Sequence, residues 1–173
     1  PLDDNAEDRI AMVKQTCEEL QLPIISVVGV SVGLIDFNPS VQKFHLERCK
    51  RYLDMGVTLS AKNYLLVIGE YIWQKEVIPP EEQWKWAVEH CQTLGEYASE
   101  CGLEIVIELE PFDLSLVNTI GEMDRFLTDC DNSAVKANID ISHMVLSDSP
   151  PESLDSLKGR AGHVHISDCD GKV

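Results

Sequence analysis

The sequence predicts a parallel α/β protein, because apolar strand-like runs alternate with amphipathic helical segments along the whole chain. The predicted strands begin near residues 24, 64, 103, 135 and 161, so a strand–helix unit recurs every 26 to 40 residues. Alternation of this kind produces right-handed βαβ units and a parallel sheet. No connecting segment is rich enough in Gly, Ser or Pro to separate domains, so we expect a single domain over residues 1–173.

The strands are predicted from short apolar runs, several of them rich in β-branched residues, that lie between turn signals. They are IISVVGVSV (24–32), YLLVIG (64–69), LEIVIELE (103–110), VKANIDIS (135–142) and AGHVHISD (161–168). The first run is apolar almost throughout and is therefore expected to be buried on both of its faces.

The helices are predicted from apolar residues at three- and four-residue spacing, together with signals for their ends. A first helix should end before Pro23, and the fourth should begin at the capping box of Thr119 and Glu122. A short helix should follow Pro150-Pro151 and end at Gly159. The two longest predicted helices begin at Asn38-Pro39-Ser40 and Pro79-Pro80 and should end at Gly56 and Gly102. The inner stripe of the helix after Pro80 should be Trp84, Val88, Cys91, Leu94, Ala98 and Cys101.

The composition excludes several classes of partner. With 30 Asp and Glu against 14 Lys and Arg, the formal charge is −16, which disfavours nucleic acid because phosphate binding needs clustered basic residues. No apolar run approaches the roughly 20 residues of a membrane span, so no membrane association is expected. The six cysteines have no C-x-x-C spacing and indicate reduced thiols in a cytoplasmic protein.

Two architectures fit the alternation, a doubly wound open sheet and a (β/α)8 barrel. The turn after Val32 lacks the G-x-G-x-x-G pattern, and no phosphate-binding loop of the G-x-x-x-x-G-K-[ST] type occurs. We therefore favour the barrel. Because a barrel of this type takes about 250 residues, the five predicted strands leave about three units unaccounted for. We expect the first strands and the last strand to be missing and the chain to belong to a longer polypeptide.

Candidate metal ligands follow the last three predicted strands, where parallel α/β proteins place their functional groups. Neighbouring strands lie about 4.8 Å apart, so side chains from three strand ends can converge on one ion. Carboxylate and imidazole together suit Mn²⁺, Co²⁺, Mg²⁺ or Zn²⁺. The candidates, in chain order, are Glu108, Glu110, Asp140, His143, His163, His165 and Asp168.

Alternation along the strands selects within this set. Glu110 and His165 are closer to the carboxyl ends than Glu108 and His163, so we expect the later residue of each pair to bind the ion. The earlier residues are expected one layer deeper, in supporting roles. Asp168 is placed to orient His165 or a substrate hydroxyl. Trp73 is a candidate wall of a sugar pocket, or else it only covers the barrel rim.

The motifs of these strand ends resemble those of the xylose-isomerase-like sugar isomerase/epimerase superfamily, which includes ketose 3-epimerases and hydroxypyruvate isomerases. They are Glu110-Pro111, the D-x-x-H of Asp140 and His143, and the H-x-H of His163 and His165. The resemblance covers Tyr64 to the end of the chain. In the epimerases an Arg follows the H-x-H, whereas here Lys172 is the basic residue nearby.

The resemblance implies a (β/α)8 barrel with a divalent-metal site. Glu110, Asp140 and His165 would be metal ligands, Glu110 would also act as acid or base, and His143 would contact a substrate oxygen. The fourth ligand of the family is a Glu on the last barrel strand, which we expect beyond Val173. Acidic barrels of this kind often form homo-oligomers.

The implied function is a metal-dependent sugar isomerase or epimerase that abstracts a proton next to a ketone and passes through an enediolate. Two alternatives remain open. One is a lyase or dehydratase that acts on a keto-sugar or cyclitol in the same superfamily. The other is a non-catalytic barrel fragment that only binds metal or partners. Related DNA-repair endonucleases need several zinc ions and a basic face, which the charge of −16 disfavours.

Overall fold

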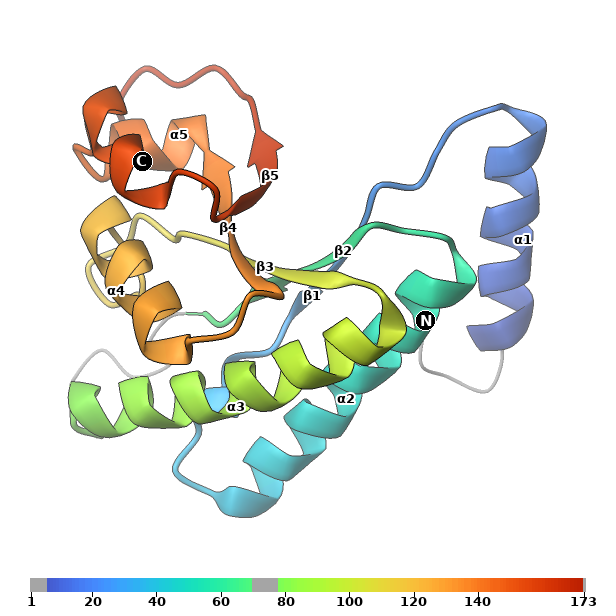
Figure 1. The fold of residues 1–173 in the computed structure, drawn as a ribbon, viewed down its shortest axis with the longest axis horizontal. Helices are drawn as coiled ribbons and strands as arrows, with labels where there is room; N and C mark the ends of the chain where they lie inside the picture. Colours follow the sequence, from blue (N-terminus) through green and yellow to red (C-terminus); the bar gives the residue numbers. More distant parts are fainter. Residues whose placement is uncertain (1–5, 70–77, 173) are drawn as a thin grey trace.

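The computed structural model describes residues 6–69 and 78–172 and contains one sheet of five parallel strands (Figure 1). The strands pair in the order β1-β2-β3-β4-β5, so each lies beside the next in the chain. Their bounds are Ser26–Val30 (β1), Asn63–Val67 (β2), Glu104–Ile107 (β3), Val135–Asp140 (β4) and Ala161–His165 (β5). The predicted parallel α/β class is confirmed.

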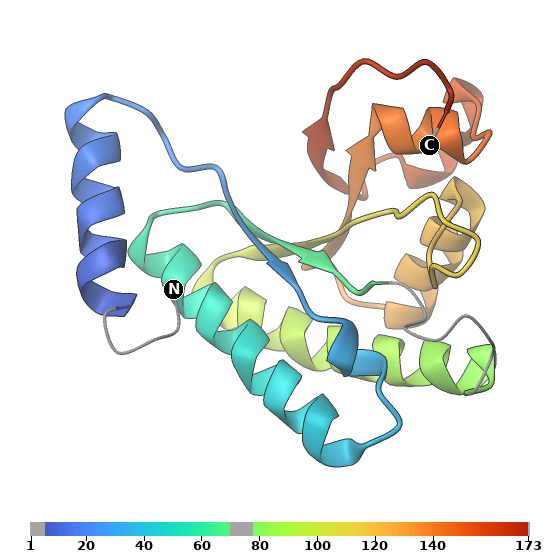
Figure 2. The same cartoon turned by 180° about the vertical axis from the view of Figure 1, so that it is seen from behind.

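Helices α2, α3 and α4 lie on one side of this sheet, as the two opposite views show (Figures 1 and 2). The helices are α1 (Ala6–Glu19), α2 (Pro39–Thr58), α3 (Pro80–Cys101), α4 (Ile120–Cys130) and α5 (Ile141–Leu146), with 3₁₀ turns at Val32–Ile35 and Pro151–Leu157. Among the described residues, no helix has both the length and the apolar character needed to cross a membrane.

The core lies between the sheet and α2, α3 and α4. Most of the predicted α3 stripe is part of it, since Cys91, Leu94 and Ala98 have no solvent exposure, while Trp84 and Val88 pack at its margin. Burial of these side chains removes apolar surface from water, which is the main force that holds helices onto a sheet. The position of α3 therefore follows from the periodicity of its sequence.

The opposite face of the sheet is less covered than the sequence predicts. Val27 packs into the core below β1, but Val28 and Val30 on its other face are 56% and 52% exposed. The expectation that this strand is buried on both faces is therefore wrong for the described residues. Helix α1 forms as predicted but has no buried residue, and it projects beyond the sheet near the end of α2 (Figure 2).

The helix ends follow local chemistry in most places. Gly102 adopts a left-handed φ of 71° and ends α3, as predicted. The capping box is also present, because Thr119 accepts a hydrogen bond from the Glu122 amide at 3.2 Å. Gly56 is not a cap, since α2 continues to Thr58; it is buried, and a Cβ there would lie 3.1 Å from the Leu103 side chain. Close packing against Leu103 explains this glycine.

We predict that Leu94→Ala lowers the free energy of unfolding by about 2–5 kcal/mol, because the truncation leaves a cavity in a fully buried part of the core. Urea denaturation followed by circular dichroism measures this loss. As a matched control, Met12→Ala on α1, where the side chain is 60% exposed, should change stability by less than about 0.5 kcal/mol. A loss below about 1 kcal/mol for Leu94→Ala would show that this face of α3 is not held in the core.

Candidate functional site

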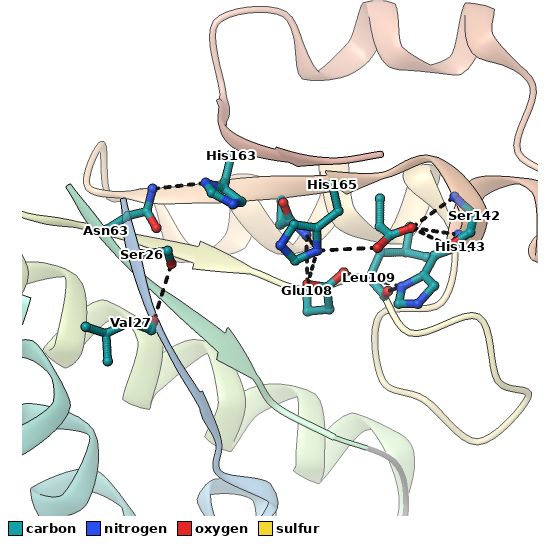
Figure 3. Close-up of polar contacts among 11 residues, drawn as sticks. Ser26, Val27, Asn63, Glu108, Leu109, Ser142, His143, His163 and His165 are labelled. Carbon is teal, nitrogen blue, oxygen red and sulfur yellow. Dashed lines mark hydrogen bonds and ion pairs between the residues drawn. The ribbon is translucent and has the colours of Figure 1, made fainter. Parts of the chain in front are cut away.

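Three ionisable side chains converge where β3, β4 and β5 end. One ligand-type atom each from Glu108, Asp140 and His165 lies within 4.8 Å of the other two (Figure 3). Asp140 and His165 are register partners in the β4–β5 pairing, and Glu108 follows the last residue of β3. The predicted convergence of three successive strand ends is therefore present in the structure.

The glutamate in this group is Glu108, which corrects the sequence-based choice of Glu110. The amide of Glu108 donates to the Leu66 carbonyl of β2 at 3.1 Å, so Glu108 still lies in the sheet and is already at its carboxyl edge. The amide of Glu110 donates to the Val117 carbonyl at 3.1 Å, in the segment that leads to α4. The chain has turned away from the strand by that point, so alternation no longer predicts where Glu110 points.

The two oxygens of the Asp140 carboxylate have separate roles. Oδ1 accepts hydrogen bonds from the Ser142 amide at 2.9 Å, the Ser142 hydroxyl at 2.6 Å and the His143 amide at 3.1 Å, and it thereby caps α5. Oδ2 lies 3.4 Å from Nδ1 of His165. Since an aspartate N-cap accepts from the amides two and three residues on, the cap turns the carboxylate toward His165.

The His165 ring presents Nδ1 to the centre of the group. This nitrogen lies 3.7 Å from Oε2 of Glu108 and 3.1 Å from Nδ2 of Asn138, in addition to its contact with Asp140. The ring is partly exposed, with 39% of its side-chain surface accessible, whereas Glu108 is 5% exposed. The site is therefore open on the His165 side and closed around Glu108.

Asn138 is a buried member of the site that the sequence reasoning missed. It lies on β4 two residues before Asp140, on the same face, and it is 1% exposed. Its Nδ2 donates to Oε2 of Glu108 at 2.7 Å. The spacing of two from Asp140 was the available signal, because side chains at i and i+2 of a strand share a face.

His143 lies beside the group and contacts the end of β3. Its Nδ1 is 2.5 Å from the Leu109 carbonyl and 3.3 Å from Oε1 of Glu108. A carbonyl can only accept, so Nδ1 carries the hydrogen in this contact and Nε2 is left with the lone pair of the neutral ring. Nδ1 thus fixes the His143 ring against the end of β3, and Nε2 can accept a hydrogen bond from a further partner.

His163 lies behind His165, where the sequence predicted a supporting residue. The two rings make an edge-to-face contact with centroids 5.0 Å apart. Nδ1 of His163 is 3.5 Å from Nδ2 of Asn63, which reaches across from β2 (Figure 3). Asn63 is 3% exposed, so this buried contact connects β2 with β5, which are not neighbours in the sheet.

A register shift in β5 sets the direction of both histidines. Ala137 pairs with Ala161, but Asn138 pairs with His163, so Gly162 is an extra residue on β5. A Cβ on Gly162 would lie 2.7 Å from Val106 Cγ1 and 3.0 Å from Lys136 Cβ. Only a residue without a side chain fits at this close approach of β5 to its neighbours.

Two predicted substrate contacts are not part of the group. Asp168 is exposed in the segment after β5, and within the described chain it makes no hydrogen bond or ion pair with His165. His165 is oriented instead by Asn138, Asp140 and Glu108, so that role of Asp168 is a wrong prediction. Trp73 lies outside the described residues.

Burial and hydrogen bonding shift the pKa values of the site carboxyls in opposite directions. Burial raises the pKa of Glu108, although the Asn138 hydrogen bond and the two nearby histidines oppose the shift. For Asp140 burial also acts to raise the pKa, but the hydrogen bonds from Ser142 and His143 outweigh it and hold the pKa below its usual value. Burial, with the neighbouring His165 ring, lowers the pKa of His163.

The donor set fits a divalent metal ion. Ligand atoms about 2.1 Å from an ion lie roughly 3.0–3.4 Å apart at right or tetrahedral angles. The distances of 3.4 Å from His165 Nδ1 to Asp140 and 3.7 Å to Glu108 are near this range. Oε1 of Glu108 is buried without a hydrogen-bond partner, and so has lone pairs available. Two carboxylates and one imidazole, with no thiolate, suit Mn²⁺, Co²⁺, Mg²⁺ or Zn²⁺.

The fold and site together define a parallel α/β protein of the barrel type with acidic and histidine side chains at the carboxyl ends of its strands. The chain matches the xylose isomerase-like TIM barrel family over residues 2–173 and belongs to that family. The predicted fold class is thereby confirmed, with five parallel strands of an incomplete barrel in the described residues.

The similar curated proteins are sugar and cyclitol enzymes. The D-psicose 3-epimerase of Ruminiclostridium cellulolyticum is 29% identical over 146 residues, which are 80% of this chain and 47% of that protein. The inosose dehydratase of Clostridium beijerinckii is 32% identical over 94 residues, 54% of this chain and 31% of that protein. The chain thus spans about half of the epimerase and about a third of the dehydratase.

Similar solved structures support the same fold. The 3-keto-D-glucoside 4-epimerase YcjR of E. coli superposes with a TM-score of 0.81 at 21% identity, covering 93% of this chain and 65% of that one. An IOLI protein with a bound zinc atom gives a TM-score of 0.76 at 18% identity, covering 98% of this chain and 63% of that one. At these identities the likeness establishes the arrangement of the strands and helices.

We predict that Gly162→Ala destabilises the protein by about 1–3 kcal/mol, because the added Cβ overlaps Val106 and forces β5 away from its neighbours. The free energy of unfolding in urea measures this. Gly121→Ala is the matched control: it lies in α4 with its nearest contact at 3.9 Å, and there Ala should be stabilising by about 0.5–1 kcal/mol. Equal stability of the two variants would contradict the close approach of β5.

Proposed function

We propose that this chain is part of a divalent-metal-dependent sugar isomerase or epimerase that moves a proton at the carbon next to a ketone. The observation that carries the proposal is the group formed by Glu108, Asp140 and His165 at the carboxyl edge of the sheet. It is supported by the family and by relatives named as 3-epimerases of D-psicose and fructoselysine. A zinc atom bound by the related IOLI protein supports the choice of a divalent metal.

In this proposal Glu108, Asp140 and His165 hold the ion through carboxylate oxygen and Nδ1. A divalent ion bound there supplies Lewis-acid stabilisation of the negative charge that develops on a substrate oxygen. Asp140 contributes through Oδ2, since Oδ1 is used by the α5 cap. The residues are oriented before any ligand arrives, which lowers the cost of assembling the site.

We also propose that Glu108, in place of Glu110, is the acid–base group. The Glu108 carboxylate would accept a proton from one face of the substrate carbon, and epimerisation then needs a second acid–base group that delivers a proton to the opposite face. Burial raises the pKa of Glu108 toward the working range of a general base. His143, held through Nδ1, presents Nε2 to a substrate oxygen.

A dehydratase is the second candidate, and the observation that favours it is the 32% identity to the inosose dehydratase over 94 residues. Both reactions begin with proton removal next to a ketone, so the same carboxylate serves either. They diverge afterwards, because an epimerase returns a proton to the carbon whereas a dehydratase expels a hydroxyl group from its neighbour. The substrate's leaving group therefore decides between them.

The metal assignment predicts a ranking of variants in Mn²⁺ titration calorimetry of the full-length protein. Glu108→Gln and Asp140→Asn should each weaken binding by at least about 100-fold, beyond the 10–100-fold typical of residues outside the ligand set. Asn remains a preferred N-cap residue, so Asp140→Asn keeps α5 and removes only the charge. Glu110→Gln is the matched control and should stay within threefold of the wild type. The reverse ranking of the two glutamates would restore Glu110 as the ligand.

The reaction is tested by incubating the full-length protein with Mn²⁺ in D₂O, with a panel of free ketoses and of cyclitol ketones. We expect a ketose to gain deuterium at the carbon next to its carbonyl and to change configuration there, as NMR detects. Loss of water from a cyclitol ketone would favour the dehydratase instead. No exchange and no elimination with any compound, although Mn²⁺ binds, would contradict both enzymatic functions.

A further inference from the structure

Asn138 lies between the three grouped side chains and contacts two of them directly. We propose that Asn138 is a positioning residue that prepares Glu108 and His165 for a divalent cation, an inference that rests on the metal-dependent function proposed above. Asn138 is a residue of β4, and the same β4–β5 pairing brings Asp140 beside His165. It is thus attached to the same rigid strand as one of the proposed ligands.

The first contact fixes the Glu108 carboxylate. Nδ2 of Asn138 donates to Oε2 at 2.7 Å. A carboxylate held by one oxygen cannot rotate freely, so the position of Oε1 is determined as well. Oε1 is buried and accepts no hydrogen bond, which leaves its lone pairs available to a cation.

The second contact selects the tautomer of His165. An amide nitrogen carries two hydrogens, so Nδ2 can donate to Oε2 of Glu108 and to Nδ1 of His165 at 3.1 Å at the same time. Acceptance by Nδ1 requires that the ring hydrogen be on Nε2. The lone pair of Nδ1 then faces the amide hydrogen of Asn138 on the side of the ring where Oδ2 of Asp140 lies 3.4 Å away, and a bound cation would replace that amide hydrogen.

The orientation of the amide follows from its surroundings. Exchange of Nδ2 and Oδ1 would place an amide oxygen 2.7 Å from a carboxylate oxygen, and neither atom has a hydrogen to share. The orientation that is observed leaves Oδ1 buried without a partner. A buried oxygen without a hydrogen bond lowers stability, so packing of the sheet alone does not explain an amide at this position. Asn138 is therefore better explained by the two side chains it holds than by stability.

The test is Mn²⁺ titration calorimetry on the full-length protein carrying Asn138→Leu, which has a similar volume and no hydrogen-bonding group. We expect affinity to fall by about 10–100-fold in a metal-free variant that circular dichroism shows to be folded. Its melting temperature should fall, because Oε2 of Glu108 loses its donor. Asn63→Leu is the matched control, because Asn63 is also a buried amide but contacts His163 and neither proposed ligand. Its Mn²⁺ affinity should remain within threefold of the wild type.

A second measurement needs no variant at position 138. Long-range ¹H–¹⁵N NMR of the metal-free wild type at alkaline pH should show His165 as the Nε2–H tautomer, with signals assigned by their loss in His165→Gln. An Nδ1–H tautomer, or wild-type affinity in Asn138→Leu, would overturn the role of Asn138 and leave the proposed function intact. Failure of the wild type to bind Mn²⁺ would overturn the proposed function and this inference together.

Discussion

The register of β4 against β5 is the constraint on which the candidate site depends. Without the extra residue at Gly162, Asp140 would pair with Val164, and both histidines would turn to the opposite face of the sheet. The shift brings His163 and His165 to the face that carries Asn138 and Asp140. The close approach of Gly162 to Val106 and Lys136 shows that this irregularity is closely packed against β3 and β4.

Asp140 links the site to the secondary structure that follows it. Asp140 is the last residue of β4, and one oxygen of its carboxylate caps α5. The helix therefore sets the orientation of the other oxygen. The D-x-x-H spacing then has a local explanation: the residue three positions after the cap lies in the first helical turn and donates its amide to Oδ1. His143 is brought back toward the end of β3 by the same turn, where it reaches the Leu109 carbonyl.

The sequence predicts those parts of the molecule that depend on local interactions. Strand and helix order, the left-handed Gly102 and the Thr119 cap all follow from periodicity or from groups a few residues apart. The choice between Glu108 and Glu110 could not be made in this way, because it depends on where β3 leaves the sheet. That point is set by the hydrogen bond of the Glu108 amide to Leu66, which is more than 40 residues earlier in the chain. Gly56 was misassigned for the same reason, since its neighbour Leu103 is distant in sequence.

The two faces of the sheet differ in the polar groups that they bury. The helix-covered face is apolar and stabilises the fold through Leu94 and its neighbours. The other face carries Asn63, Glu108 and Asn138, each nearly buried and each with an oxygen that has no hydrogen-bond partner. Such atoms reduce stability unless a ligand satisfies them, and departures from good packing are expected where a protein binds or reacts. These atoms lie beside the carboxylates and imidazole that fit a cation, so the destabilising groups coincide with the candidate site.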